Sequence, residues 1–120
     1  EEAVTHFEQA IQHNPTFAEA MQQLARIYAT HQRPDMRDAA QAVRLARRAC
    51  ELTGQKNPVC LRTLAAAYAE SGRFDQSRET VQTALQLART SGRRPLVALL
   101  QADLALYQQG RPRRNGPPVP

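Results

Sequence analysis

Three histidines and two cysteines are the residues of this sequence best suited to bind a metal or to act as nucleophiles. His6, His13 and His31 fall on separate turns or helix ends, with no cysteine or carboxylate at the spacing that a metal site requires. Neither an HExxH nor a CxxC motif occurs in the sequence. We therefore interpret the histidines as surface residues and expect neither a metal nor a cofactor.

The two cysteines fit a buried structural role better than a catalytic one. Cys50 holds the same place in an apolar helical stripe as Ile11 and Leu85, which favours a small core residue over a reactive thiol. Cys60 begins the next helix, ten residues further along the chain. A disulfide between the two stays open for an exported protein, and we favour free thiols.

The glycines and serines also form no catalytic motif. Gly54, Gly72 and Gly92 each stand singly after a helical stretch, where a glycine ends or turns a helix. Ser71 and Ser91 precede two of these glycines and have the composition of turns. The sequence therefore has no glycine-rich phosphate loop and no nucleophile motif, and we expect a protein that is not an enzyme.

An internal repeat organises the elements that carry these residues. The motif Leu-Ala-x-x-Tyr occurs at residues 24–28 and again at residues 64–68. Three copies of a second helix have small and large apolar residues at matching places: Ala3, Phe7, Ala10 and Ile11; Ala42, Ala46, Ala49 and Cys50; and Ser77, Val81, Ala84 and Leu85. The offsets put each set on one face of a helix, which predicts its buried face. Duplicated helix pairs of this kind stack into a solenoid.

In these residues the sequence resembles the tetratricopeptide repeat family, whose 34-residue helix-turn-helix unit has Leu, a small residue and Tyr in its first helix. The family's second helix has Ala, an aromatic residue and Ala, where the best copy in this chain has Ser77, Val81 and Ala84. The resemblance implies an all-α, right-handed solenoid of antiparallel helix pairs. It has two full repeats, a leading half-repeat and a C-terminal capping helix.

We expect one repeat domain at residues 1–110 and a separate tail. The parts of the domain are the second helix of a truncated repeat at 2–13, a repeat with an insertion between its helices at 16–56, a repeat at 58–91 and a capping helix at 95–109. In the capping helix the apolar stripe is Leu96, Leu99, Leu100, Leu104 and Tyr107, and we expect Gln101, Asp103 and Gln108 to face outward. The basic, proline-rich tail at 111–120 has no helical period, so we expect it to be extended or disordered unless a surface holds it.

The net charge of +5 is spread in a way that argues against nucleic acid as the main partner. Three positive charges belong to the tail, which leaves the rest of the chain with an excess of only two. The other basic residues alternate with apolar ones and fit the solvated side of helices. Nucleic-acid binding through Arg89, Arg93, Arg94 and the tail remains a weaker alternative.

The chain opens on Glu1 inside a repeat, so we expect it to be a segment of a longer protein. Its sequence, for example in the segments Ala49–Thr53 and Thr63–Glu70, resembles bacterial repeat segments at the end of long multidomain proteins, some of them membrane glycosyltransferases. The resemblance therefore also allows a regulatory or substrate-positioning tail of a larger enzyme. No run is apolar enough to cross a bilayer, and cytoplasm and periplasm both stay open.

The resemblance implies protein–protein binding, with the first helices lining a concave groove that takes a peptide or helix of a partner. The residues that we expect to be exposed in this groove are Glu19, Gln22, Arg26, Thr30, Val59, Arg62, Ala66 and Glu70. Arg26 and Arg62 are the residues that we expect to pair with a peptide carboxylate. The Lys and Asn set with which one subtype of the family grips chaperone tails is absent here.

The N-terminal end of the stack has an incomplete repeat. Without a first helix before it, the helix at 2–13 leaves Phe7 and Ile11 short of one neighbour. We therefore expect either self-association through this end or fraying of the helix.

Overall fold

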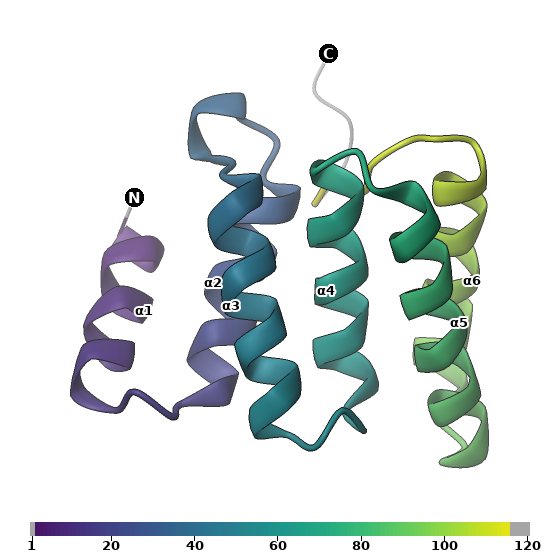
Figure 1. Ribbon diagram of the computed structural model, residues 1–120, viewed down its shortest axis with the longest axis horizontal. Helices are drawn as coiled ribbons and strands as arrows, with labels where there is room; N and C mark the ends of the chain where they lie inside the picture. The colour runs from purple at the N-terminus through teal and green to yellow at the C-terminus, as the bar shows by residue number, and fades with distance from the viewer. Residues whose placement is uncertain (1, 116–120) are drawn as a thin grey trace.

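The computed structural model describes residues 2–115, which form α-helices joined by short connections (Figure 1). The helices are α1 (Glu2–His13), α2 (Ala18–Thr30), α3 (Ala39–Leu52), α4 (Pro58–Glu70), α5 (Phe74–Thr90) and α6 (Arg94–Gln108). A short 3-10 helix, η1 (Pro34–Met36), lies in the connection between α2 and α3. No strand is present among residues 2–115, so the predicted all-α class is confirmed.

The helices lie in two layers (Figure 1). α3 and α5 lie in the layer nearer the viewer, while α2, α4 and α6 lie behind them. α2 packs against both α3 and α4, and α5 packs against both α4 and α6. α4 and α6, by contrast, approach each other closely at few backbone positions. We call the outer surface of α2, α4 and α6 the even-helix face.

Side-chain caps fix where two of the helices begin. The Asp38 carboxylate accepts a hydrogen bond from the Gln41 N–H at the start of α3, at 3.1 Å. The Asn57 side chain accepts from the N–H groups of Val59 and Cys60 at 2.9 and 3.3 Å. These oxygens satisfy N–H groups that have no partner within the first turn of a helix, so the chain enters α3 and α4 at defined residues.

The repeated residues form the core between the two layers. Leu24, Ala25, Leu64 and Ala65 are all buried. The second-helix sets on α3 and α5 are buried as well, from Ala42 to Cys50 and from Ser77 to Leu85. Small residues on one helix allow close approach of the next, and larger ones fill the remaining space. The predicted buried stripes of these two helices are therefore confirmed.

The matching stripe of α1 is less covered because α1 packs mainly against one helix, α2. α1 packs against α2, and it has no buried residue. Phe7 and Ile11 are half-buried against the core. The first helix of the chain is therefore the least covered of those that the structure describes.

The buried stripe of α6 is centred elsewhere than predicted. Leu96, Leu100 and Tyr107 are buried, but Leu99 is 48% exposed and Asp103, which we expected to face outward, is 3% exposed. At about 100° per residue, Asp103 and Tyr107 lie about 20° to either side of Leu96, whereas Leu99 lies about 60° to one side of it. The prediction for Asp103 was wrong because this face of α6 turns toward α4.

Among residues 2–115, none of the helices has both the length and the apolar character needed to cross a membrane.

Candidate functional site

The eight residues predicted to be exposed in a groove lie on α2 and α4, and most of them are covered. Glu19 is the exposed member of the set, Arg26, Val59, Arg62 and Glu70 are half-buried, and Gln22, Thr30 and Ala66 are buried. The structure therefore contradicts the expected exposure of Gln22, Thr30 and Ala66. Two causes account for this, namely close packing between α2 and α4 and coverage by the chain that follows α6.

Gln22 and Thr63 join α2 to α4 inside the structure. Gln22 Nε2 donates a hydrogen bond to Thr63 Oγ1 at 2.7 Å, and both residues are nearly inaccessible to solvent. Ala66 is 2% exposed on the same side of α4. A buried polar pair of this kind is costly to break from one side, so Gln22 serves to fix the two helices together.

Arg26 keeps its polar contacts on its own helix. Its Nε and Nη2 donate to Gln23 Oε1 at 3.1 and 3.0 Å, and its side chain is half-buried. No described acidic side chain forms an ion pair with it. Of the two arginines predicted to contact a partner, Arg26 is the one that retains a free charge on the even-helix face.

Arg62 is committed to a neighbour. Its Nε lies 2.6 Å from Asp103 Oδ2 and its Nη2 donates to Asp103 Oδ1 at 3.3 Å, so the guanidinium grips the carboxylate at two points. The pair spans the gap between α4 and α6, and the Asp103 side chain is 4% exposed. Arg62 therefore orients a buried acid rather than projecting into solvent.

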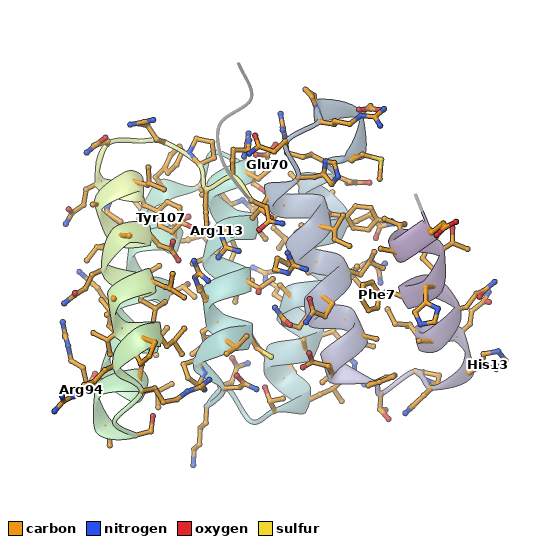
Figure 2. All side chains as sticks on the ribbon, turned by 180° about the vertical axis from the view of Figure 1, so that it is seen from behind. Phe7, His13, Glu70, Arg94, Tyr107 and Arg113 are labelled. Atoms are coloured by element: carbon orange, nitrogen blue, oxygen red, sulfur yellow. The ribbon has the colours of Figure 1, made fainter. Side chains whose placement is uncertain are left out.

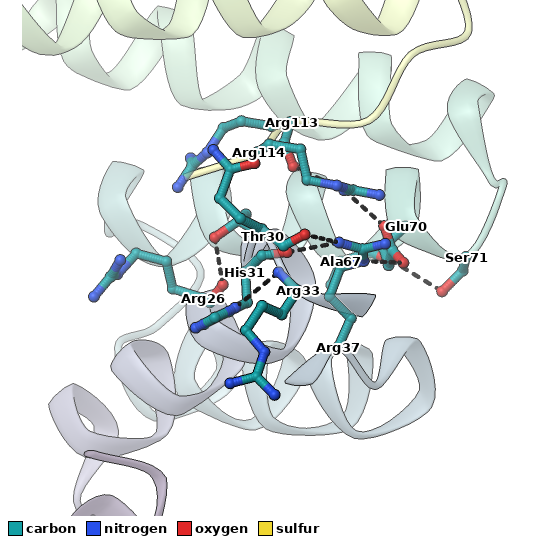
Figure 3. Close-up of polar contacts among 11 residues, drawn as sticks. Arg26, Thr30, His31, Arg33, Arg37, Ala67, Glu70, Ser71, Arg113 and Arg114 are labelled. Carbon is teal, nitrogen blue, oxygen red and sulfur yellow. Dashed lines mark hydrogen bonds and ion pairs between the residues drawn. The ribbon is translucent and has the colours of Figure 1, made fainter. Parts of the chain in front are cut away.

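Glu70 sits between two arginines at the C-terminal end of α4 (Figure 3). Its Oε2 is 3.2 Å from Arg37 Nε, and its Oε1 is 2.8 Å from Arg114 Nη1. Arg37 in turn donates to the carbonyl oxygens of His31 and Gln32 at 2.7 and 3.1 Å. The insertion between α2 and α3 is thereby anchored to the end of α4.

The chain after α6 returns across the even-helix face (Figure 2). Gly110 has φ +67°, a left-handed conformation that disfavours other residues, and the Arg111 N–H donates to the Leu106 carbonyl at 3.0 Å. This helix ending reverses the chain. Residues 111–115 are then held against the helices, while residues 116–120 of the predicted tail lie outside the described residues.

Arg113 is the buried residue of this segment, at 8% exposed. Its Nη1 lies 3.8 Å from Asp103 Oδ2, so Asp103 is shared between Arg62 and Arg113. Burial, followed by the nearby positive charge of Arg62, lowers the pKa of Arg113, and the Asp103 carboxylate opposes that shift. Arg113 Nη1 and the Tyr107 hydroxyl are both buried without a hydrogen-bond partner among the described residues.

Backbone hydrogen bonds hold the far end of the segment on α2. The Asn115 N–H donates to the Thr30 carbonyl at 2.7 Å, and Gln32 Nε2 donates to the Asn115 carbonyl at 2.7 Å. Thr30 is the last residue of α2, where carbonyl groups lack partners within the helix. The segment, which has neither helix nor strand, thus runs from α6 over α4 to the end of α2.

Sequence reasoning missed Asp103, Gln32, Arg113 and Arg114 as members of one site. The signal available for Asp103 was a carboxylate within the apolar stripe of α6, which calls for a buried partner. The other three carry no such signal. Gln32 and Arg114 contact residues more than 40 positions away, and Arg113 reaches Asp103 only because the chain reverses after α6.

The cysteines and histidines form no site in the described part of the chain. Cys50 and Cys60 are buried free thiols, and no metal-holding group of His, Cys, Asp and Glu side chains occurs within residues 2–115. Burial, with smaller contributions from Cys60 and Glu51, raises the pKa of Cys50 to about 12. Such a thiol is protonated at neutral pH and is a poor nucleophile.

A cleft of about 500 Å³ lies on the opposite side, where α1, α2 and α3 meet. Ile11, Met21, Leu24 and Tyr28 supply its apolar wall, and polar side chains surround it.

The arginines proposed for nucleic acid do not gather into one patch. Arg93 and Arg94 are exposed at the beginning of α6, while Arg113 and Arg114 lie near its end (Figure 2). The 15 residues of α6 separate the two groups by roughly 20 Å.

Comparison with known proteins connects this arrangement to one family. Residues 6–43, which run from α1 through α2 into α3, match the model of the tetratricopeptide repeat. No curated protein and no solved structure matches the chain. The matched residues include the Leu-Ala-x-x-Tyr motif at 24–28, and the helices beyond them repeat its pattern in the structure. The chain therefore contains a tetratricopeptide repeat at residues 6–43, within an all-α structure of repeated helices.

Proposed function

We propose that this chain is a protein-binding module that takes an extended peptide of a partner protein along the even-helix face. Tetratricopeptide repeats generally mediate protein–protein interaction, and stacked helix repeats bind through an extended surface. The observation that carries the proposal is the segment at 111–115, a non-helical stretch of chain that already lies on this face.

The contacts of that segment are those by which proteins hold extended peptides. Main-chain hydrogen bonds give affinity, and side-chain pockets give specificity. The even-helix face offers the Thr30 carbonyl and the Gln32 amide to a backbone, and Asp103 and Glu70 to side chains. Arg26 adds a positive charge beside them. The helices that carry these groups are fixed by core packing, so little order has to be gained on binding.

We propose a role without catalysis. The proposed site has ion pairs and hydrogen bonds but no nucleophile next to a base within the described residues. Rigid presentation of the even-helix face is sufficient for the proposed activity.

A peptide selection with a matched pair of variants tests the proposal. Arg26 on α2 and Arg44 on α3 each bond through Nε and Nη2 to a Gln three residues earlier, so they are local equivalents in different layers. Peptides selected from a random library on the immobilised chain would be measured against Arg26→Glu and Arg44→Glu by fluorescence anisotropy. We expect Arg26→Glu to change the affinity about tenfold or more, weaker for acidic peptides and tighter for basic ones, and Arg44→Glu to leave it unchanged. Selected peptides that respond to Arg44→Glu and not to Arg26→Glu would place the binding surface elsewhere.

A further inference from the structure

We propose that the even-helix face recognises two consecutive arginines in an extended peptide, and that Arg113 and Arg114 occupy this arginine-pair site as an intramolecular ligand. The site consists of Asp103, Glu70, the Thr30 carbonyl and the Gln32 amide. This inference rests on the proposed function, because it names the chemistry of the peptide that the face takes.

Asp103 on α6 and Glu70 on α4 each contact one arginine of the helical domain and one arginine of the tail. Asp103 is bound by Arg62 at 2.6 Å and approached by Arg113 at 3.8 Å. Glu70 is bound by Arg37 through Oε2 and by Arg114 through Oε1. In both cases the arginine of the helical domain, Arg62 on α4 or Arg37 in the α2–α3 connection, fixes the position of the acid, and the second contact of the acid is directed toward the tail. Adjacent residues of an extended chain therefore meet two acids that are already oriented.

Burial makes the Asp103 half of the site selective. The Asp103 and Arg113 side chains are only 4% and 9% exposed. A charge taken out of water is tolerated when an opposite charge and hydrogen bonds compensate it, so a neutral side chain would leave the acid undercompensated. The planar guanidinium can serve several acceptors at once, which an ammonium group does less well.

Arg113 of the tail occupies the site at Asp103 without forming a hydrogen bond to it. Arg113 Nη1 lies 3.8 Å from Asp103 Oδ2, beyond hydrogen-bond distance, and neither Arg113 Nη1 nor the Tyr107 hydroxyl has a hydrogen-bond partner among the described residues. Arg113 reaches this position immediately after the turn at Gly110, so the tether to α6 restricts how it can settle. A separate peptide has no such tether, and its arginine can approach both acceptors.

The backbone contacts fix the register of the ligand. The residue after the arginine pair, Asn115 in the tail, donates its N–H to the Thr30 carbonyl and accepts from Gln32 Nε2, both at 2.7 Å. These contacts involve only main-chain atoms of the tail, so they do not select the side chain at this position. The recognised element is therefore an Arg-Arg pair followed by a residue with a free N–H.

A tethered ligand competes with any partner at an effective concentration in the millimolar range for a short linker. Weakening the hold of the tail on the site should therefore increase the affinity for a free peptide. The probe is a fluorescein-labelled peptide with the sequence of residues 110–115, Gly-Arg-Pro-Arg-Arg-Asn. Its binding to the full chain is measured by anisotropy, for the wild type and for Arg113→Ala/Arg114→Ala.

We expect the double variant to bind the probe at least about tenfold more tightly than the wild type. In the double-variant background, Glu70→Gln should weaken binding again, and Glu79→Gln, which changes an exposed acid on α5, should have no effect. A probe with both adjacent arginines replaced by lysine should bind more weakly than the arginine probe. Circular dichroism confirms that each variant keeps its helices. Glu70→Gln is preferred to Asp103→Asn because the Glu70 side chain is 17% exposed and the Asp103 side chain only 4%.

Three results would overturn the inference. They are no gain of probe binding in the double variant, equal binding of the lysine and arginine probes, and tighter binding of a probe that carries Glu-Glu in place of Arg-Arg. The last result, if sensitive to Arg26→Glu, would leave the proposed function intact and reverse only the chemistry of the ligand. Failure of the proposed function itself is recognised separately, by selected library peptides whose affinity does not change in Arg26→Glu.

Discussion

Arg62 on α4 and Asp103 on α6 form a two-point ion pair, with Nε 2.6 Å from Oδ2 and Nη2 3.3 Å from Oδ1. The pair lies where α4 and α6 make few close backbone contacts, and Arg113 covers it from the tail. One carboxylate therefore connects two helices and the segment that crosses them. The stability of the fold and the occupancy of the even-helix face are coupled at Asp103.

Asp103→Ala should destabilise the chain strongly. The substitution leaves Arg62 and Arg113 without their shared acid in a poorly hydrated place, and breaking a buried pair from one side costs about 3 kcal/mol or more. Urea unfolding followed by circular dichroism measures the change. Asp75→Ala is the control, because the Asp75 side chain is 93% exposed and its pair with Arg78 should contribute less than about 1 kcal/mol. Equal losses of unfolding free energy in the two variants would show that the buried ion pair stabilises the chain no more than the exposed pair does.

Gly110→Ala should loosen the tail through backbone strain alone. Gly110 has φ +67°, and a Cβ at this position would meet no atom within 4 Å, so the expected cost of about 1 kcal/mol comes from the left-handed conformation. The exposed neighbour substitution Gln109→Ala should cost less than about 0.5 kcal/mol. Amide exchange at Asn115, whose N–H is bonded to Thr30, should accelerate in Gly110→Ala only. If amide exchange at Asn115 is unchanged in Gly110→Ala, the turn at Gly110 does not contribute to holding the tail on the helices.

The Cys50 thiol should make the fold sensitive to alkaline pH. Burial raises its pKa from 9.0 to about 12 in the folded chain, so the folded state binds the proton more tightly than the unfolded state. The resulting stabilisation is complete below about pH 9 and is lost as the pH rises toward 12. Cys50→Ala should therefore lose less stability than the wild type between pH 8 and pH 10.5 in urea unfolding. Parallel losses in the two proteins would contradict the assignment.

Thiol labelling tests independently whether the two cysteines are buried. Both cysteines are free and buried, and burial raises the pKa of each. At pH 8 a thiol-specific reagent should react slowly with the native chain and rapidly, at two sites, in denaturant. Rapid labelling of the native chain would show that one of the thiols is accessible.

Helix α1 should be the most weakly protected of the described helices. It has no buried residue and packs mainly on α2. Native-state hydrogen exchange should show its amides opening well before those of α4, and Phe7→Ser/Ile11→Ser should release α1 with little effect on the other helices. If the chain instead forms a dimer through this end, analytical ultracentrifugation should show that the same double substitution restores the monomer. A monomer with full protection of α1, or a dimer that survives the substitution, would contradict the respective expectation.

The local pattern of residues was enough to predict the helices and the buried stripes of α3 and α5. Leu24 and Ala25 recur as Leu64 and Ala65, and helical spacing alone puts such residues on one face, whatever the rest of the chain does. Because each repeat packs mainly on its neighbours, this local information carried over into the all-α stack of helices. The same spacing misplaced Leu99 and Asp103 on α6. A stripe predicted from apolar residues alone is centred on the leucines, and it leaves out a carboxylate that is buried because it has a charged partner.

The content of the even-helix face was decided by tertiary structure. Whether Arg62 reaches solvent depends on how far α6 lies from α4, and that distance follows from packing between helices, not from the sequence of either one. Likewise, residues 111–115 have no periodicity that predicts a contact, and they stay on the surface because Asp103, Glu70 and the free carbonyl at the end of α2 converge there. Periodicity is a property of neighbours along the chain, whereas charge pairing needs residues that only the folded stack brings together.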